Sequence, residues 1–201
     1  MSASALALPP GLDTPARIQA FLDEVPYSAD RFYRCPRRVL ADRRAHCFDG
    51  AVFAAAALSR LGFPPRILDM LPENDDDHVL ALFRVDGRWG AVAKSNFSGL
   101  RFREPVYRGL RELVMSYFEL FYNVLREKTL RGYTVPLRLD AFAGWETRDE
   151  TMDAIADRLD RLRRIPLLTP AMVARLSPVD PRSYEAGLLG VLPEGLYKPP
   201  E

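Results

Sequence analysis

The stretch from residue 47 to residue 61, CFDGAVFAAAALSRL, constrains the fold more than any other part of the chain. Its alanines, phenylalanines, valine and leucines predict a helix that is apolar on nearly every side, and such a helix is buried inside a domain. Gly62 suits the position just beyond a helix end, and Pro64 and Pro65 prevent the helix from continuing. The sequence therefore predicts a central buried helix that carries Cys47 in its first turn.

The segment after this helix has the pattern of β-strands. Residues 66–71, RILDML, are predicted to form a strand, and the acidic loop PENDDD of residues 72–77 follows it. The sequence HVLALFRV, the turn Asp86-Gly87 and the sequence RWGAVAK together predict a β-hairpin over residues 78–94. We therefore expect a hairpin strand to lie alongside the buried helix.

The remaining elements are predicted to be helices. Thr14 suits the cap of a helix and Pro15 its first position, and Pro36 can begin a short helix. Apolar residues at helical spacing predict a long amphipathic helix over about residues 108–127. A charged amphipathic helix is predicted within residues 148–164, and short helices broken by proline and glycine are expected after it.

The length of 201 residues is enough for one sizeable core, in which about two thirds of the unfolded surface is buried. We expect residues 1–135 to form this core together with the N-terminal helices. Residues 136–201 are expected to form a helical extension packed on it, within one compact domain.

The charge balance gives no general attraction to nucleic acid or to a membrane. The chain has 28 basic and 27 acidic residues and a net charge of +1. Six arginines lie between residues 31 and 44, where Asp30 and Asp42 partly offset them, and a solvated face of salt bridges is the expected result. The longest apolar run, residues 51–58, is far shorter than the about 20 residues of a membrane span. We therefore expect neither nucleic acid nor membrane as a partner.

The location predicted from the sequence is the cytoplasm. The N-terminus has no basic segment of the kind that begins a signal peptide. Cys35 and Cys47 are the only cysteines, and two thiols do not form a disulfide framework, so a reducing compartment is expected. Frequent arginine, alanine, leucine and proline are typical of a GC-rich bacterial genome.

The position of Cys47 suggests chemistry. The free N–H groups of a helix N-terminus carry about half a positive charge, which favours a thiolate and lowers its pKa. Those N–H groups can also bind the oxyanion of an acyl-transfer reaction. A thiol nucleophile needs a base, and His78 opens the hairpin, whereas His46 adjoins Cys47 and is expected to point elsewhere. A purely structural role stays open, because a free cysteine is often only a small buried apolar residue.

A metal site is the weaker alternative. Cys35, His46, Cys47 and His78 are four potential zinc ligands, but an adjacent His-Cys pair cannot easily reach one tetrahedral ion. The acidic loop of residues 72–77 lacks the alternating oxygen spacing and the glycine of an EF-hand. We therefore expect neither a metal nor a cofactor.

The stretch from Cys47 to Arg66 resembles the nucleophile helix of the transglutaminase-like superfamily, which has the papain-like cysteine-protease fold. Gly62-Phe63-Pro64-Pro65-Arg66 matches the exit of that helix, His78 matches the base, and Gly87-Arg88-Trp89 matches the turn after it. The resemblance covers about residues 44–96. It implies an α+β fold in which the buried nucleophile helix packs on a small antiparallel sheet.

The chain departs from the superfamily pattern at residue 93. The resemblance places there the Asp that orients the histidine, but this chain has Ala93. Asn96 is the candidate replacement, which needs a bend or bulge to face the same side, and Ser95 or Asp77 are weaker ones. An aromatic residue that the superfamily has shortly after the histidine is also absent, since this chain has Ala81 there.

Three functions follow from these patterns. The first is a cysteine-dependent acyl-transfer enzyme, a peptidase, amidase or transferase, in which Cys47, His78 and Asn96 act on a peptide or another amide or ester. The second is a catalytically inactive binding or scaffold protein of the same fold, which Ala93 favours. The third is a small partner protein whose C-terminal 50 or so residues cover another subunit.

Overall fold

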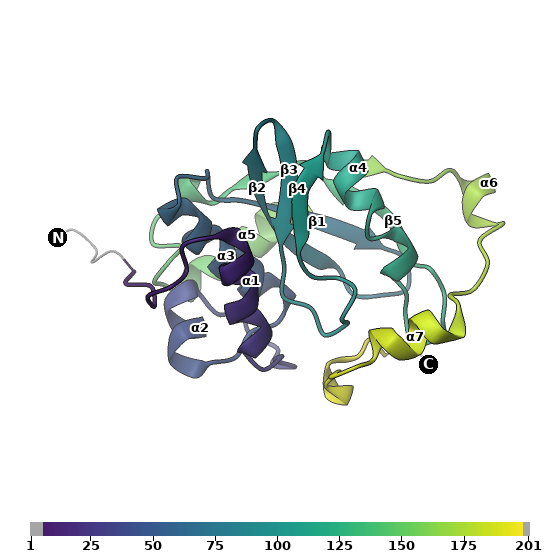
Figure 1. Cartoon of the computed structure of the whole chain (residues 1–201), viewed down its shortest axis with the longest axis horizontal. Coiled ribbons are helices and arrows are strands. Elements are labelled where there is room, and N and C mark those ends of the chain that lie inside the picture. Colours follow the sequence, from purple (N-terminus) through teal and green to yellow (C-terminus); the bar gives the residue numbers. More distant parts are fainter. Residues whose placement is uncertain (1–5, 199–201) are drawn as a thin grey trace.

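One antiparallel sheet organises the part of the chain that the computed structural model describes, residues 6–198. Its strands lie in the order β4-β3-β2-β1-β5-β7, and β6 also pairs with β1 (Figure 1). All the pairings are antiparallel. The strands are β1 (Arg66–Pro72), β2 (His78–Val85), β3 (Arg88–Val92), β4 (Arg103–Tyr107), β5 (Leu130–Thr134), β6 (Leu137–Arg138) and β7 (Arg164–Pro166).

Helices pack around this sheet. Figure 1 shows α1, α2 and α3 grouped together, with α4 beside β4 and α7 at the other end of the molecule. The α-helices are α1 (Pro15–Glu24), α2 (Pro36–Asp42), α3 (Cys47–Arg60), α4 (Leu110–Met115), α5 (Glu150–Asp160), α6 (Pro170–Val173) and α7 (Pro181–Gly187). Short 3-10 turns cover Phe118–Leu120, Leu139–Ala141 and Pro193–Gly195.

Alternating side chains of β2 divide the core into two layers. Val79 and Phe83 point to the layer that contains α3, whereas Leu80 and Leu82 point to the layer that contains α4. This alternation follows from the two-residue period of a strand. The fold is therefore α+β, with a buried helix against an antiparallel sheet, as predicted. The predicted strand of residues 66–71 and the hairpin with its Asp86-Gly87 turn are also confirmed.

Helix α3 is the most enclosed element, since all its residues from Phe48 to Leu58 are buried. It approaches the chain beyond β3 so closely that a Cβ atom at Gly50 would lie 2.2 Å from the Cβ of Lys94. Lys94 is itself buried, and its ammonium donates to the carbonyls of Leu22 (2.8 Å) and Val25 at the end of α1. The close approach thus ties α3, α1 and the sheet together.

The long helix predicted for residues 108–127 is wrong in its length. Helix α4 ends at Met115, and a 3-10 turn follows at Phe118–Leu120. The hydroxyl of Ser116 donates to the carbonyl of Leu113, and the guanidinium of Arg103 donates to the carbonyl of Ser116. The apolar spacing therefore continues beyond Met115 without an α-helix.

The C-terminal third is less helical than predicted. Strands β6 and β7 lie within it, and β7 pairs with β5 across the expected boundary at residue 135. Helix α5 packs into the α3 layer through Met152, Ile155 and Leu159. Residues 136–198 thus complete the sheet as well as covering it.

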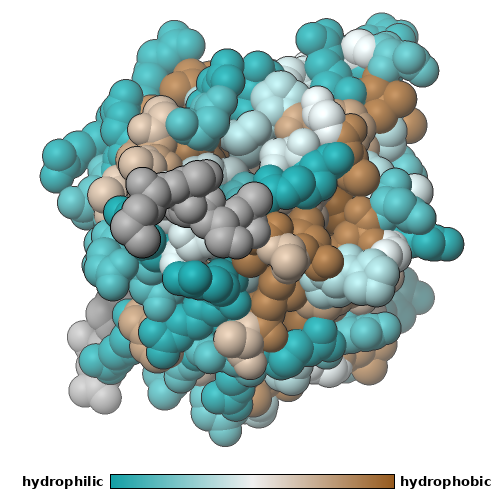
Figure 2. Space-filling model, turned by 90° about the vertical axis from the view of Figure 1, so that its left-hand side faces the viewer, coloured by the Kyte–Doolittle hydropathy of each residue, from teal (hydrophilic) through white to brown (hydrophobic). Residues whose placement is uncertain are grey.

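The surface mixes polar and apolar side chains. Figure 2 shows a band of apolar residues bordered by hydrophilic ones on one face of the molecule. Within residues 6–198, the helices are all too short or too polar to cross a lipid bilayer.

The close contact at Gly50 predicts that one added methyl group lowers the stability of the folded protein. We expect Gly50→Ala to lower the free energy of unfolding by about 2 kcal/mol, since overpacking outweighs the about 1 kcal/mol that alanine gains in a helix. Urea denaturation measures the change. Gly109→Ala is the matched control, because its Cβ would meet nothing within 4 Å. An equal effect of the two substitutions would refute the tight α3 contact.

Candidate functional site

His46 fixes the point at which α3 begins. Its Nδ1 atom accepts hydrogen bonds from the backbone N–H groups of Phe48 (3.2 Å) and Asp49 (3.5 Å). The Asp49 carboxylate in turn accepts from the backbone N–H of His46 (3.3 Å), which completes a capping box. His46 thus has a structural role, and Cys47 becomes the first residue of the helix.

A buried ion pair between Arg34 and Asp49 holds the capping residue Asp49 in place. The Asp49 carboxylate accepts from the backbone N–H of Arg34 at 2.8 Å, and the Arg34 guanidinium lies 3.7 Å from it. Arg34 also binds Asp42 at 3.0 Å and Ser28 at 3.1 Å. Burial raises the pKa of Asp49 to about 7, although the charge of Arg34 opposes this shift. Sequence analysis missed this pair, because Arg34 lies within an arginine-rich run that predicts a solvated face.

The sulfur of Cys47 lies against the start of β2. Its thiol donates to the carbonyl oxygen of Asp77 at 3.6 Å. Burial raises the pKa of the Cys47 thiol to about 12. Burial thus opposes the lowering of this pKa that the helix N-terminus predicts.

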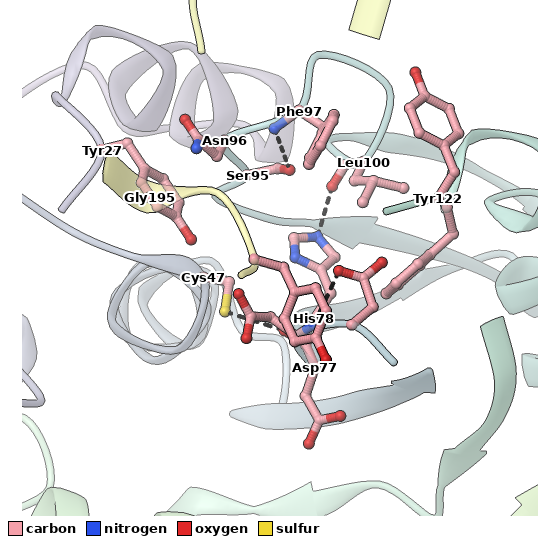
Figure 3. A pocket seen from close by; sticks show the side chains of 14 residues that line it. Tyr27, Cys47, Asp77, His78, Ser95, Asn96, Phe97, Leu100, Tyr122 and Gly195 are labelled. Atoms are coloured by element: carbon pink, nitrogen blue, oxygen red, sulfur yellow. Dashed lines mark hydrogen bonds between the residues drawn. The ribbon is translucent and has the colours of Figure 1, made fainter. Parts of the chain in front are cut away.

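His78 is held by a backbone group. This buried first residue of β2 places Nε2 at 2.7 Å from the carbonyl oxygen of Leu100. A carbonyl can only accept, so Nε2 carries the proton and Nδ1 keeps a free lone pair. In the view of Figure 3 this second nitrogen lies on the Cys47 side of the ring. Burial lowers the pKa of His78 to about 4, which keeps the ring neutral at pH 7.

The predicted pairing of Asn96 with His78 is not made. The Asn96 side chain donates to the carbonyl of Leu192 and accepts from its backbone N–H, each at 2.9 Å. Leu100 is the partner of the His78 Nε2 atom instead. Ala93, at the expected Asp position, is buried, and the side chain of Gln19 binds its backbone N–H and carbonyl at 3.0 Å each. A main-chain carbonyl, and not a side chain, is thus the partner that orients His78.

Cys47 and His78 line one small cavity of about 40 Å³, to which the acidic loop before β2 and the segment after β3 contribute. Several of its residues are drawn in Figure 3. A cavity of this size holds a few water molecules at most. Tyr27 lines the same cavity and also borders the neighbouring hollow that Cys47 shares. Burial raises the pKa of Tyr27, so its hydroxyl stays protonated and can donate.

One wall of the cavity comes from residues 192–197, which we call the C-terminal strap. Gly195 and Tyr197 line the cavity, and Gly195 also borders a second hollow that Cys47 shares. A Cβ atom at Gly195 would lie 2.8 Å from the ring of Tyr27 and 3.1 Å from the Asn96 amide nitrogen. The strap is therefore packed tightly against this chain, close to the thiol.

The anchoring of the strap predicts how accessible Cys47 is. We expect Asn96→Ala to raise the alkylation rate of Cys47 by about 5- to 30-fold, since two lost hydrogen bonds weaken the strap by about 1–2 kcal/mol. Iodoacetamide labelling in a Cys35→Ser background measures this rate at one fixed pH. The control is Ser59→Ala, which removes a hydrogen bond to the Ala56 carbonyl near the far end of α3. An unchanged rate in Asn96→Ala would show that the strap does not limit access.

Comparison with known proteins leaves the family open. No protein-family model matches the sequence. No curated protein matches it either. Among solved structures, Legionella pneumophila LapG (EGTA-treated) is similar, with 11% sequence identity and a TM-score of 0.39 over 70% of this chain and 77% of that chain. A likeness of this size carries no argument about function, which therefore depends on the residues of the chain itself.

Proposed function

We propose that the protein is a cysteine-dependent acyl-transfer enzyme, with Cys47 as nucleophile and His78 as general base. One observation carries the proposal: both side chains line the same cavity, and the bond to Leu100 leaves the other nitrogen of His78 free to accept a proton. A nucleophile beside a base whose tautomer is fixed by a third group is the arrangement that covalent catalysis needs. The resemblance of residues 44–96 to the transglutaminase-like pattern supports the same assignment.

The reaction begins from neutral partners. A pKa of about 12 for Cys47 and about 4 for His78 disfavour a resting thiolate–imidazolium pair. The proton therefore passes from the sulfur to Nδ1 as the sulfur bonds to the substrate carbonyl carbon. The Tyr27 hydroxyl, which lines the same cavity and stays protonated, is the donor that would hold the resulting oxyanion.

The second half of the reaction returns the proton. The tetrahedral intermediate collapses, the bond to the leaving nitrogen or oxygen breaks, and His78 protonates the leaving group. The product is a thioester on Cys47. Water that attacks this thioester gives a peptidase or amidase, whereas an amine gives a transferase. The substrate class is an amide or ester.

A binding or scaffold protein of the same fold is the second candidate. Ala93 favours it, because no carboxylate is available at that position to stabilise a charged imidazole. The third prediction, a C-terminal segment that covers another subunit, has less support. Residues 186–192 of that segment bind Asn96 and Ser98 of this chain.

An activated ester tests the proposed chemistry without knowledge of the natural substrate. With p-nitrophenyl acetate we expect release of p-nitrophenol and a single acetyl group on Cys47, detected by mass spectrometry of the quenched protein. Cys47→Ala should abolish the adduct, and His78→Gln should lower the rate by about 10²–10⁴-fold. Circular dichroism checks that each variant is folded.

The control is Cys35→Ser, which removes the other thiol. Cys35 is buried and lies outside the cavity that Cys47 and His78 line, so this variant should react like the natural chain. An acetyl group on Cys35, or a rate that His78→Gln leaves unchanged, would reject the Cys47–His78 pair and favour the scaffold alternative.

A further inference from the structure

Three aspartates from distant parts of the chain converge behind the Cys47 cavity. Asp69 lies in β1, Asp77 directly precedes β2, and Asp160 is the last residue of α5. Each offers a carboxylate oxygen, and these oxygens all lie within 4.8 Å of one another. Like charges this close repel each other, so the cluster needs a compensating partner.

Asp69 shows that the compensation is incomplete. Asp69 is only 2% exposed, and its Oδ1 atom has no hydrogen-bond partner among residues 6–198. A buried carboxylate oxygen without a partner is costly and rare in native structures. Arg164, on β7, is the nearby cation that favours the charged forms of Asp69 and Asp77. Burial nevertheless raises the pKa of both carboxyl groups.

A shared proton does not complete the cluster. The carboxyl groups of Asp69 and Asp77 lie close enough to share one proton. Such a proton would join one oxygen of Asp69 and leave its other oxygen without a partner. The shared proton also leaves the negative charge of Asp160 uncompensated. A cation that touches all three carboxylates would satisfy the oxygens and remove the repulsion together.

We propose that Asp69, Asp77 and Asp160 form a binding site for a calcium ion. The donors are carboxylate oxygens alone, without histidine or cysteine, and such a set favours hard cations. Oxygens within 4.8 Å of one another can all contact one Ca²⁺ at about 2.4 Å, and three carboxylates suit Ca²⁺ better than Mg²⁺, which proteins ordinarily hold through one or two. Asp77 and Asp160 are exposed, which gives the ion an entry path and leaves positions for water.

The site connects to the cavity through Asp77. The carboxylate of this residue belongs to the cluster, whereas its carbonyl oxygen contacts the Cys47 sulfur at 3.6 Å. The next residue is His78. A bound ion would therefore fix the end of the acidic loop beside the thiol. The inference itself does not depend on the proposed function, because ion binding is measured without any substrate.

Isothermal titration of the full chain with CaCl₂ at neutral pH tests the site. We expect one ion per chain with a dissociation constant of about 10⁻⁴–10⁻³ M, the range of sites with few protein ligands. About 10 mM Ca²⁺ should then raise the thermal midpoint by about 3–10 °C. Asp160→Asn should weaken binding at least about tenfold. Asp153→Asn, an exposed aspartate of the same helix, should bind as the natural chain does.

Three results would overturn the site. They are the absence of saturable binding up to about 10 mM Ca²⁺, equal binding by Asp160→Asn and the natural chain, and tighter binding of Mg²⁺ than of Ca²⁺. The variant Asp69→Asn distinguishes a bound ion from a shared proton as the group that stabilises the cluster. If it raises the thermal midpoint without Ca²⁺ and the natural chain binds no ion, a proton alone holds the cluster. If the natural chain binds Ca²⁺ and Asp69→Asn does not, the assignment holds.

Discussion

The hydrogen bond between the His78 ring and the Leu100 carbonyl is the interaction on which the site depends. At 2.7 Å, it places the proton on Nε2 and leaves Nδ1 as the only basic nitrogen of the ring. The superfamily that residues 44–96 resemble uses a carboxylate for this purpose, which also stabilises the imidazolium that forms. A carbonyl orients the ring equally well but offers only a dipole, so the charged ring is less stabilised here.

The second constraint is the enclosure of the Cys47 helix. Cys47 stands at the helix start because His46 and Asp49 cap the helix and Arg34 compensates the buried carboxylate of Asp49. The same enclosure removes water from the sulfur and raises its pKa to about 12. The C-terminal strap, which packs against Tyr27 and Asn96, encloses the sulfur further. If the proposed function holds, the strap would have to move before a substrate reaches the sulfur.

The sequence predicts the features of this fold that arise from local pattern. The apolar run of α3, its Gly62 exit and the Asp86-Gly87 hairpin follow from spacing and turn chemistry, and each is confirmed. The partner of His78 could not be predicted, because a main-chain carbonyl leaves no trace in residue type. The short α4 and the Asp69 cluster depend on contacts between distant segments, which a periodic pattern does not encode.

The tautomer of His78 is the most direct test of the central claim. Long-range ¹H–¹⁵N correlation of protein labelled at histidine reports which ring nitrogen is protonated, and His46→Asn leaves His78 as the sole histidine while keeping a helix cap. The account predicts a proton on Nε2 and a free Nδ1 near pH 7, unchanged at about pH 5 because burial lowers the pKa of His78 to about 4. A proton on Nδ1, or an imidazolium at about pH 5, would contradict it.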